Sequence, residues 1–86
     1  MFRILYSPRF NREYKKLFTL VQEKAMTTID DLRIDPFAPH LKTHKLQGNL
    51  QKFYACSVTY SYRIIFEFIE NQTILLRSVG DHSIYD

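Results

Sequence analysis

The sequence predicts an α+β domain of order β-α-α-β-β-β, in which an antiparallel sheet packs against an N-terminal helical hairpin. Two observations carry this prediction. Apolar residues recur at helical spacing between residues 10 and 32, and three strand-like apolar runs separated by short turns fill residues 53–79. At 86 residues the chain has room for one domain, spanning residues 1–86, and not for two.

Residues 2–6 are apolar and predict the first strand. Ser7 can cap a helix and Pro8 suits the first helical position, so a helix is expected to start there. Four apolar residues then follow at i, i+4, i+7 and i+8 and predict one buried helical face: Phe10, Tyr14, Leu17 and Phe18.

A second helix should follow, because its apolar residues repeat the same period: Val21, Ala25, Ile29 and Leu32. We expect it to end near Arg33, since Pro36 disfavours helix at the residue before it. Residues 35–39 form a stiff connector. Residues 40–51 are interpreted as a basic loop with a short extended piece near 41–46.

The second half predicts three strands at residues 53–60, 62–69 and 73–79, the last two joined by a short turn at 70–72. In the middle strand, alternation places four residues on one face: Tyr62, Ile64, Phe66 and Phe68. Cys56 lies in the preceding strand and is expected to be a small core residue rather than a nucleophile.

The cysteine content and the hydropathy of the chain indicate its location in the cell. The single Cys56 excludes an intramolecular disulfide and, without a targeting segment, indicates the reducing cytoplasm. No apolar run approaches the roughly 18 residues that a membrane helix needs, so no membrane partner is expected.

The net charge of +3 is unevenly distributed. Residues 1–18 carry five Arg or Lys against one Glu, and residues 40–52 carry three lysines and no acid. Clustered cations favour a polyanionic partner. An acidic protein partner or a solvated face would explain them as well.

Arg63 is the sharpest candidate functional residue. Alternation places it opposite Ile64 and Phe66, on the face away from the main core. It can be an exposed strand residue paired with Glu67, or a clamp for phosphate, whose geometry guanidinium suits.

Two further candidates follow the last strand. His82 is either a surface side chain or an acid or base suited to neutral pH. Tyr85 can stack on a base or orient a phosphate, or it can anchor the C-terminus by packing. A Ser-His-Asp triad from Asp81, His82 and Ser83 is improbable, because sequence neighbours on an extended segment point to opposite sides.

The basic loop offers four candidate phosphate ligands: His44, Lys42, Lys45 and Lys52. His40 and His44 share the i, i+4 spacing of a helical metal pair, but Pro39 favours a loop and no nearby Cys or carboxylate completes a ligand set. The chain also has no Gly-rich phosphate loop and no carboxylate cluster suited to Mg²⁺. We therefore expect neither a metal nor another cofactor.

The sequence resembles the RelE/ParE superfamily of type II toxins, specifically its RelE/StbE and YafQ-like branch. The resemblance spans nearly the whole chain. It rests on the element order and on three motifs, which are His-Lys-Leu-Gln-Gly at 44–48, Tyr-Arg-Ile-Ile-Phe at 62–66 and Gly-Asp-His-Ser-Ile-Tyr at 80–85.

This resemblance implies a RelE-like fold and a toxin that cuts mRNA on the ribosome until a cognate antitoxin inhibits it. Arg63 matches the strand arginine that stabilises charge on the scissile phosphate, and His82 matches a catalytic histidine or arginine. Tyr85 matches the terminal aromatic residue, and His44 matches a histidine ahead of the sheet in YafQ-like members.

The sequence departs from the family on the strand before the arginine. Some members carry lysines where this chain has Tyr54 and Cys56. YafQ-like members carry histidine and acidic residues there, whereas this chain offers three small residues: Ala55, Ser57 and Ser61. The resemblance therefore leaves the general base unassigned.

The implied reaction needs no metal: an RNA 2′-hydroxyl attacks the adjacent phosphorus, with Arg63 stabilising charge and His82 moving a proton. A ParE-like toxin that inhibits gyrase is the main alternative, because fold and helices would look alike. A non-catalytic nucleic-acid-binding module is a third reading, and it leaves His82 without a role.

Overall fold

The computed structural model describes residues 1–50 and 52–82, which form a five-stranded sheet with helices against it. The strands are β1 (Arg3–Tyr6), β2 (His44–Lys45), β3 (Tyr54–Ser57), β4 (Arg63–Ile69) and β5 (Thr73–Gly80), in the order β1-β5-β4-β3-β2. β1 lies parallel to β5, and the other neighbouring pairs are antiparallel. The predicted α+β class and its meander are confirmed, with β1 added in parallel beside β5.

The first helix, α1 (Pro8–Lys15), starts as its sequence predicts. The Phe10 N–H donates to Ser7 Oγ at 3.0 Å, and Pro8 occupies the first turn. The helix ends before Leu17, because the last turn tightens into i→i+3 hydrogen bonds, including one from the Lys16 N–H to the Glu13 carbonyl at 3.1 Å. The chain then turns, and Phe18 is 76% exposed, so its assignment to the buried face was wrong.

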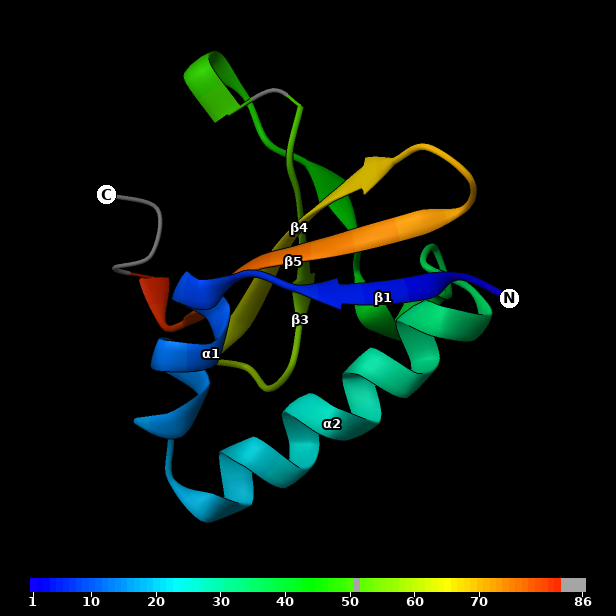
Figure 1. The fold of residues 1–86 in the computed structure, drawn as a ribbon. Helices are drawn as coiled ribbons and strands as arrows, with labels where there is room; N and C mark the ends of the chain where they lie inside the picture. Colours follow the sequence, from blue (N-terminus) through cyan, green and yellow to red (C-terminus); the bar gives the residue numbers. More distant parts are fainter. Residues whose placement is uncertain (51, 83–86) are drawn as a thin grey trace.

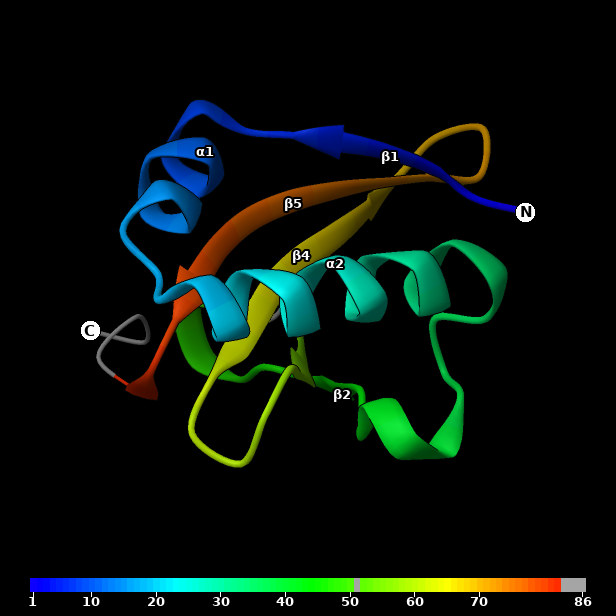
Figure 2. The same ribbon diagram turned by 90° about the horizontal axis from the view of Figure 1, so that it is seen from below.

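The second helix, α2 (Thr19–Ile34), runs below the sheet in Figure 1 and across its face in Figure 2. Its predicted stripe packs inward, with Ala25, Ile29 and Leu32 fully buried. Ile29 and Leu32 join Phe10 and the inner residues of the strands in one hydrophobic core, whose strand members are Ile4, Cys56, Ile64, Phe66, Ile74, Leu76 and Val79. No helix of the described residues is long and apolar enough to cross a membrane.

Two short 3₁₀ helices in the basic loop were not predicted: η1 (Pro39–Leu41) and η2 (Gly48–Leu50). The extended piece expected near 41–46 contains β2. Between η1 and β2 the chain is held against the body, since Leu41 is buried in the core. Residues 46–50 and 52, which we call the arm, instead project from the sheet (Figure 1).

The expected strand at residues 53–60 is shorter in the structure because its second half is a turn. The Val58 and Thr59 N–H groups both donate to the Tyr62 carbonyl, at 2.9 and 3.3 Å. Residues 58–62 therefore form a loop, which we call the hairpin loop, between β3 and β4. It places Arg63 at the very start of β4.

Cys56 has the structural role that the sequence predicts. Its side chain is fully buried, and this burial raises the pKa of the thiol from 9.0 to about 12, despite opposing effects of the Ile64 backbone and the Arg63 charge. The thiol is therefore protonated at neutral pH and contributes packing.

Candidate functional site

Arg63 lies where three strands meet at one end of the sheet. Its backbone pairs with Ser57 on β3 and with Gly80 on β5. The neighbouring Ile64 is fully buried, whereas Arg63 is only half-buried, which agrees with the predicted alternation. The sheet thus holds the backbone of Arg63 firmly while leaving its side chain accessible.

The hairpin loop fixes the guanidinium of Arg63. Nη1 donates to the carbonyl oxygens of Thr59 and Tyr60, both at 2.9 Å, and to that of Tyr62 at 3.2 Å. A guanidinium has five N–H donors, of which two are on Nη1. The other three, on Nε and Nη2, donate to none of the described residues. One nitrogen therefore anchors the group, and the remainder can bind an anion in the forked geometry that phosphate favours.

Arg63 does not form the ion pair with Glu67 that the sequence offered as its non-functional role. Glu67 instead pairs with Arg77, whose Nη1 lies 3.3 Å from Glu67 Oε2. The hydrogen bonds of Arg63 are local to the hairpin loop, so its positive charge is not neutralised by a carboxylate of the described residues.

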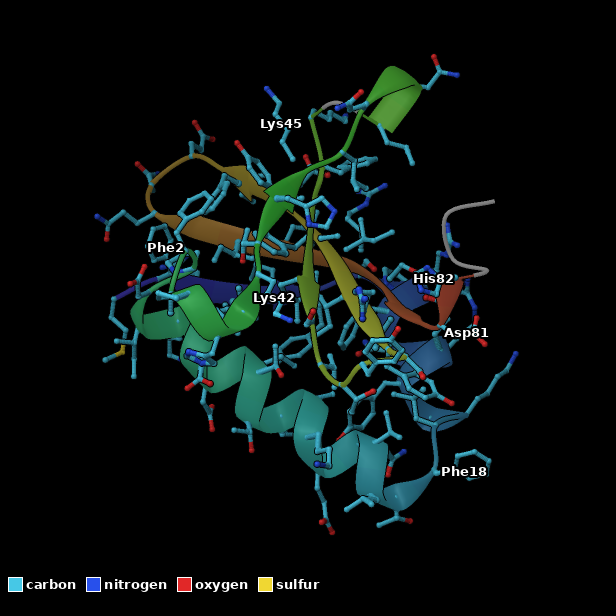
Figure 3. The ribbon with its side chains drawn as sticks, turned by 180° about the vertical axis from the view of Figure 1, so that it is seen from behind. Phe2, Phe18, Lys42, Lys45, Asp81 and His82 are labelled. Atoms are coloured by element: carbon cyan, nitrogen blue, oxygen red, sulfur yellow. The ribbon has the colours of Figure 1, made fainter. Side chains whose placement is uncertain are left out.

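His82 follows the last strand at the same end of the sheet. Gly80, the backbone partner of Arg63, precedes it by two residues. The side chain of His82 is exposed, and Figure 3 shows it beside Asp81 just beyond β5. The register thus brings the two predicted catalytic residues to one end of the sheet. Tyr85, the third, lies outside the described residues.

Glu13 holds this end of β5 in place, a role that the sequence did not suggest. β5 extends beyond its parallel partner β1, so its last residues have no strand beside them on that edge. The Glu13 Oε1 accepts hydrogen bonds from Ser78 Oγ at 2.6 Å and from the Val79 N–H at 3.1 Å. The carboxylate of α1 therefore takes the place of a neighbouring strand just ahead of His82.

A cleft opens beside Arg63, between α2 and the hairpin loop. Its cavity volume is about 500 Å³. Charged and aromatic residues from four parts of the chain line it: Lys24 and Asp31 of α2, His40 of η1, Lys42, Tyr60 of the hairpin loop and Arg63. Sequence reasoning missed Lys24 and Tyr60, since nothing in the local pattern of either residue indicates that α2 crosses the hairpin loop.

The structure separates the predicted phosphate ligands of the basic loop. Lys42 lines the cleft, whereas Lys45 lies near the arm, away from Lys42 and His82 in Figure 3. Lys52 packs its Nζ over the Phe53 ring, 5.3 Å from the centroid. The Nδ1 of His44 lies 3.2 Å from the Lys42 carbonyl oxygen. Of the four, only Lys42 lines this cleft.

The two histidines of the basic loop do not form a pair. Nε2 of His40 lies 2.9 Å from Oδ2 of Asp31, whereas His44 contacts the loop backbone. Within residues 1–50 and 52–82, no group of three or more His, Cys, Asp or Glu side chains is arranged to hold a metal ion.

The register also shows which β3 residues can reach a ligand beside Arg63. Tyr54 and Cys56 pair with Phe66 and Ile64 and pack with the core. Ser57 is the residue opposite Arg63. β3 therefore supplies no cation beside the arginine.

Comparison with known proteins identifies the class. The family model of the RelE-like toxin of the type II toxin–antitoxin system HigB matches residues 5–82. The chain therefore belongs to the RelE-like toxins of type II toxin–antitoxin systems, within the RelE/ParE superfamily that the sequence indicated. The matching model is HigB-like, whereas the motifs had favoured the YafQ-like branch.

Solved structures with the same fold include several toxins. The YoeB/ParE toxin from Agrobacterium tumefaciens superposes with a TM-score of 0.81 at 17% identity, covering 93% of this chain and 98% of that one. The toxin–antitoxin complex RelBE2 from Mycobacterium tuberculosis gives 0.80 at 14% identity, over 94% and 98%. YafQ from Escherichia coli gives 0.70 at 19% identity, over 99% and 98%. No curated protein sequence matches the chain significantly.

Proposed function

We propose that this toxin is a metal-independent endoribonuclease that cuts mRNA on the ribosome, in the cytoplasm, and that a cognate antitoxin inhibits it. The observation that carries the proposal is the guanidinium of Arg63. It is anchored through Nη1, while its three further N–H donors bind none of the described residues, and it lies at the end of the sheet that His82 follows. An anchored cation of this kind stabilises charge that develops on a phosphate.

The proposed reaction is an internal transesterification of RNA. The 2′-oxygen of one nucleotide forms a bond to the adjacent phosphorus while the bond from phosphorus to the 5′-oxygen breaks. The products are a 2′,3′-cyclic phosphate and a free 5′-hydroxyl. The 2′-hydroxyl loses its proton to a base, and the leaving 5′-oxygen gains one from an acid.

Each of the three predicted catalytic residues has a role in this reaction. Arg63 binds the non-bridging phosphate oxygens, whose negative charge grows in the transition state. His82 protonates the leaving 5′-oxygen, since histidine is the side chain that enzymes use most often for proton transfer. Tyr85 stacks on a substrate base or orients the phosphate, a role that rests on its place in the family motif.

An antitoxin partner follows from the family and from the charge of the chain. The RelBE2 complex is a toxin with its antitoxin. The five basic residues of the first 18, against one acid, suit an acidic and partly disordered partner that orders on binding.

The proposal is tested by a translating extract supplied with mRNA, with cleavage ends mapped by primer extension. We expect Arg63→Ala and His82→Gln each to lower cleavage by about 100-fold or more. Arg3→Ala is the matched control, because Arg3 is an exposed sheet arginine whose partner Thr73 lies at the other end of β5. Growth arrest with intact mRNA and broken DNA would contradict the proposal and favour a gyrase target.

A further inference from the structure

The cleft beside Arg63 has the size and lining of a ligand site that the catalytic residues alone do not explain. Its volume of about 500 Å³ lies within the range of small-molecule pockets, about 300–1,000 Å³. Its lining comes from polar residues of α2, from the hairpin loop and from η1. The hairpin loop is the same segment that anchors the guanidinium.

The charge of the cleft favours an anion. Lys24, Lys42 and Arg63 line it, and they come from three separate parts of the chain. Asp31 is the carboxylate in the lining, and His40 lies against it at 2.9 Å. Neither lysine forms an ion pair with any residue in 1–50 or 52–82. Two lysine charges therefore remain available to a phosphate group.

The hairpin loop adds an aromatic surface to these cations. Tyr60 lines the cleft and is 94% exposed, the largest exposure of any large hydrophobic residue described. Its carbonyl oxygen binds Arg63 Nη1, so its backbone is fixed relative to the guanidinium. An exposed aromatic ring beside cations is the arrangement by which proteins bind single-stranded nucleic acid, since bases stack on the ring while cations contact phosphates.

We propose that this cleft binds the nucleotide next to the scissile phosphate of the RNA. Lys24 and Lys42 contact its phosphate, and its base stacks on Tyr60. Because Arg63 lines the same cleft, one RNA strand can reach the reacting phosphate and this nucleotide together. The inference rests on the proposed nuclease function. It adds a second site of contact with the RNA to the phosphate site at Arg63.

An acidic peptide is the other ligand that the lysines would accept. Two features favour RNA. The exposed Tyr60 ring provides a surface on which a base can stack, whereas carboxylates do not stack. The guanidinium of Arg63, with three remaining donors, suits phosphate. The two ligands differ in what they require of Tyr60, so that residue separates them.

The test is a binding titration with a 2′-O-methylated RNA trinucleotide, which lacks the attacking hydroxyl and so is not cut. We expect its addition to shift the backbone NMR signals of Lys24, Lys42 and Tyr60. Lys24→Ala and Lys42→Ala should each weaken binding by about three- to tenfold. Tyr60→Ala should weaken it at least about fivefold, and Tyr60→Phe should restore it.

Lys15→Ala is the matched control, since Lys15 is an exposed lysine of α1 and does not line the cleft. Equal losses for Lys15→Ala and Lys42→Ala would overturn the inference, because binding would then reflect net charge. Unchanged binding by Tyr60→Ala would overturn it as well. So would tighter binding of an acidic peptide than of the RNA in the cleft.

The mRNA cleavage assay separates this inference from the function on which it rests. Signal shifts in the cleft with no cleavage in the extract would support the cleft as a nucleotide site and contradict the nuclease proposal. Cleavage that depends on Arg63, with no shift in the cleft, would support the nuclease proposal and overturn the inference.

Discussion

Both ends of the basic loop carry lysines, but one end is packed against the body of the protein and the other projects from it. Before β2, Lys42 follows η1 and lines the cleft with Arg63. At the other end, Lys45 is the last residue of β2 and Lys52 belongs to the arm, which projects from the sheet (Figure 1). In the sequence these lysines form one cluster. In the fold only Lys42 lines the cleft.

The difference follows from one apolar contact. Leu41 is 1% exposed and packs in the core, and the Lys42 N–H donates to the Pro39 carbonyl at 3.2 Å. Lys42 is thus tied to the body of the protein. η2 in the arm has no buried residue, and the arm closes on itself through the hydrogen bond from the Leu46 N–H to the Phe53 carbonyl at 2.9 Å. A charge cluster therefore acquires a defined position only where a buried neighbour holds it.

The largest effect that separates the two ends should come from their leucines. We expect Leu41→Ala to lower the free energy of unfolding by about 2 to 4 kcal/mol, because it leaves a cavity in the core. Leu46→Ala, at a half-buried position, should cost less than about 1.5 kcal/mol. Urea denaturation measures both. Equal losses would show that the arm is as firmly packed as η1.

The next largest effect should be on RNA binding and should come from the lysines at the two ends. Lys42→Ala should weaken RNA binding by about three- to tenfold and reduce the slope of log affinity against log salt by about 0.7, the value for one phosphate contact on a single strand. Lys45→Ala should change both quantities less. Fluorescence anisotropy across a salt series tests this, and a larger loss for Lys45→Ala would reverse the comparison.

The smallest effect should come from Gly48 in the arm. Its φ of +67° lies in the left-handed region, yet a Cβ added there would meet nothing within 4 Å. We expect Gly48→Ala to cost about 1 kcal/mol from backbone strain alone. mRNA cleavage should be unchanged. A fall in cleavage would mean that the arm takes part in the reaction.

Much of the fold is local in origin and could be predicted. The cap at Ser7 and Pro8, the stripe of α2 and the strand alternation around Arg63 all depend on residues close in sequence. The prediction for Phe18 was wrong because a helical period does not reveal where the last turn tightens. β3 ended early because the turn is closed by the Tyr62 carbonyl and not by glycine or proline.

Only part of the candidate site could be predicted from the sequence. Arg63 and His82 stood out through a strand pattern and a terminal motif. Lys24, Tyr60 and Glu13 did not, because their positions depend on α2 crossing the hairpin loop and on α1 replacing a strand beside β5. Such contacts join residues far apart in the chain, and neither periodicity nor charge encodes them.

The most direct test of the proposed chemistry changes a single atom of the substrate. Once a cleavage position has been mapped in an mRNA, that message is prepared again with one 2′-deoxynucleotide immediately 5′ of the scissile phosphate. We expect the toxin to lose cleavage there and to keep it at other positions, because the attacking oxygen is gone. Undiminished cleavage at the deoxynucleotide would contradict attack by the 2′-hydroxyl.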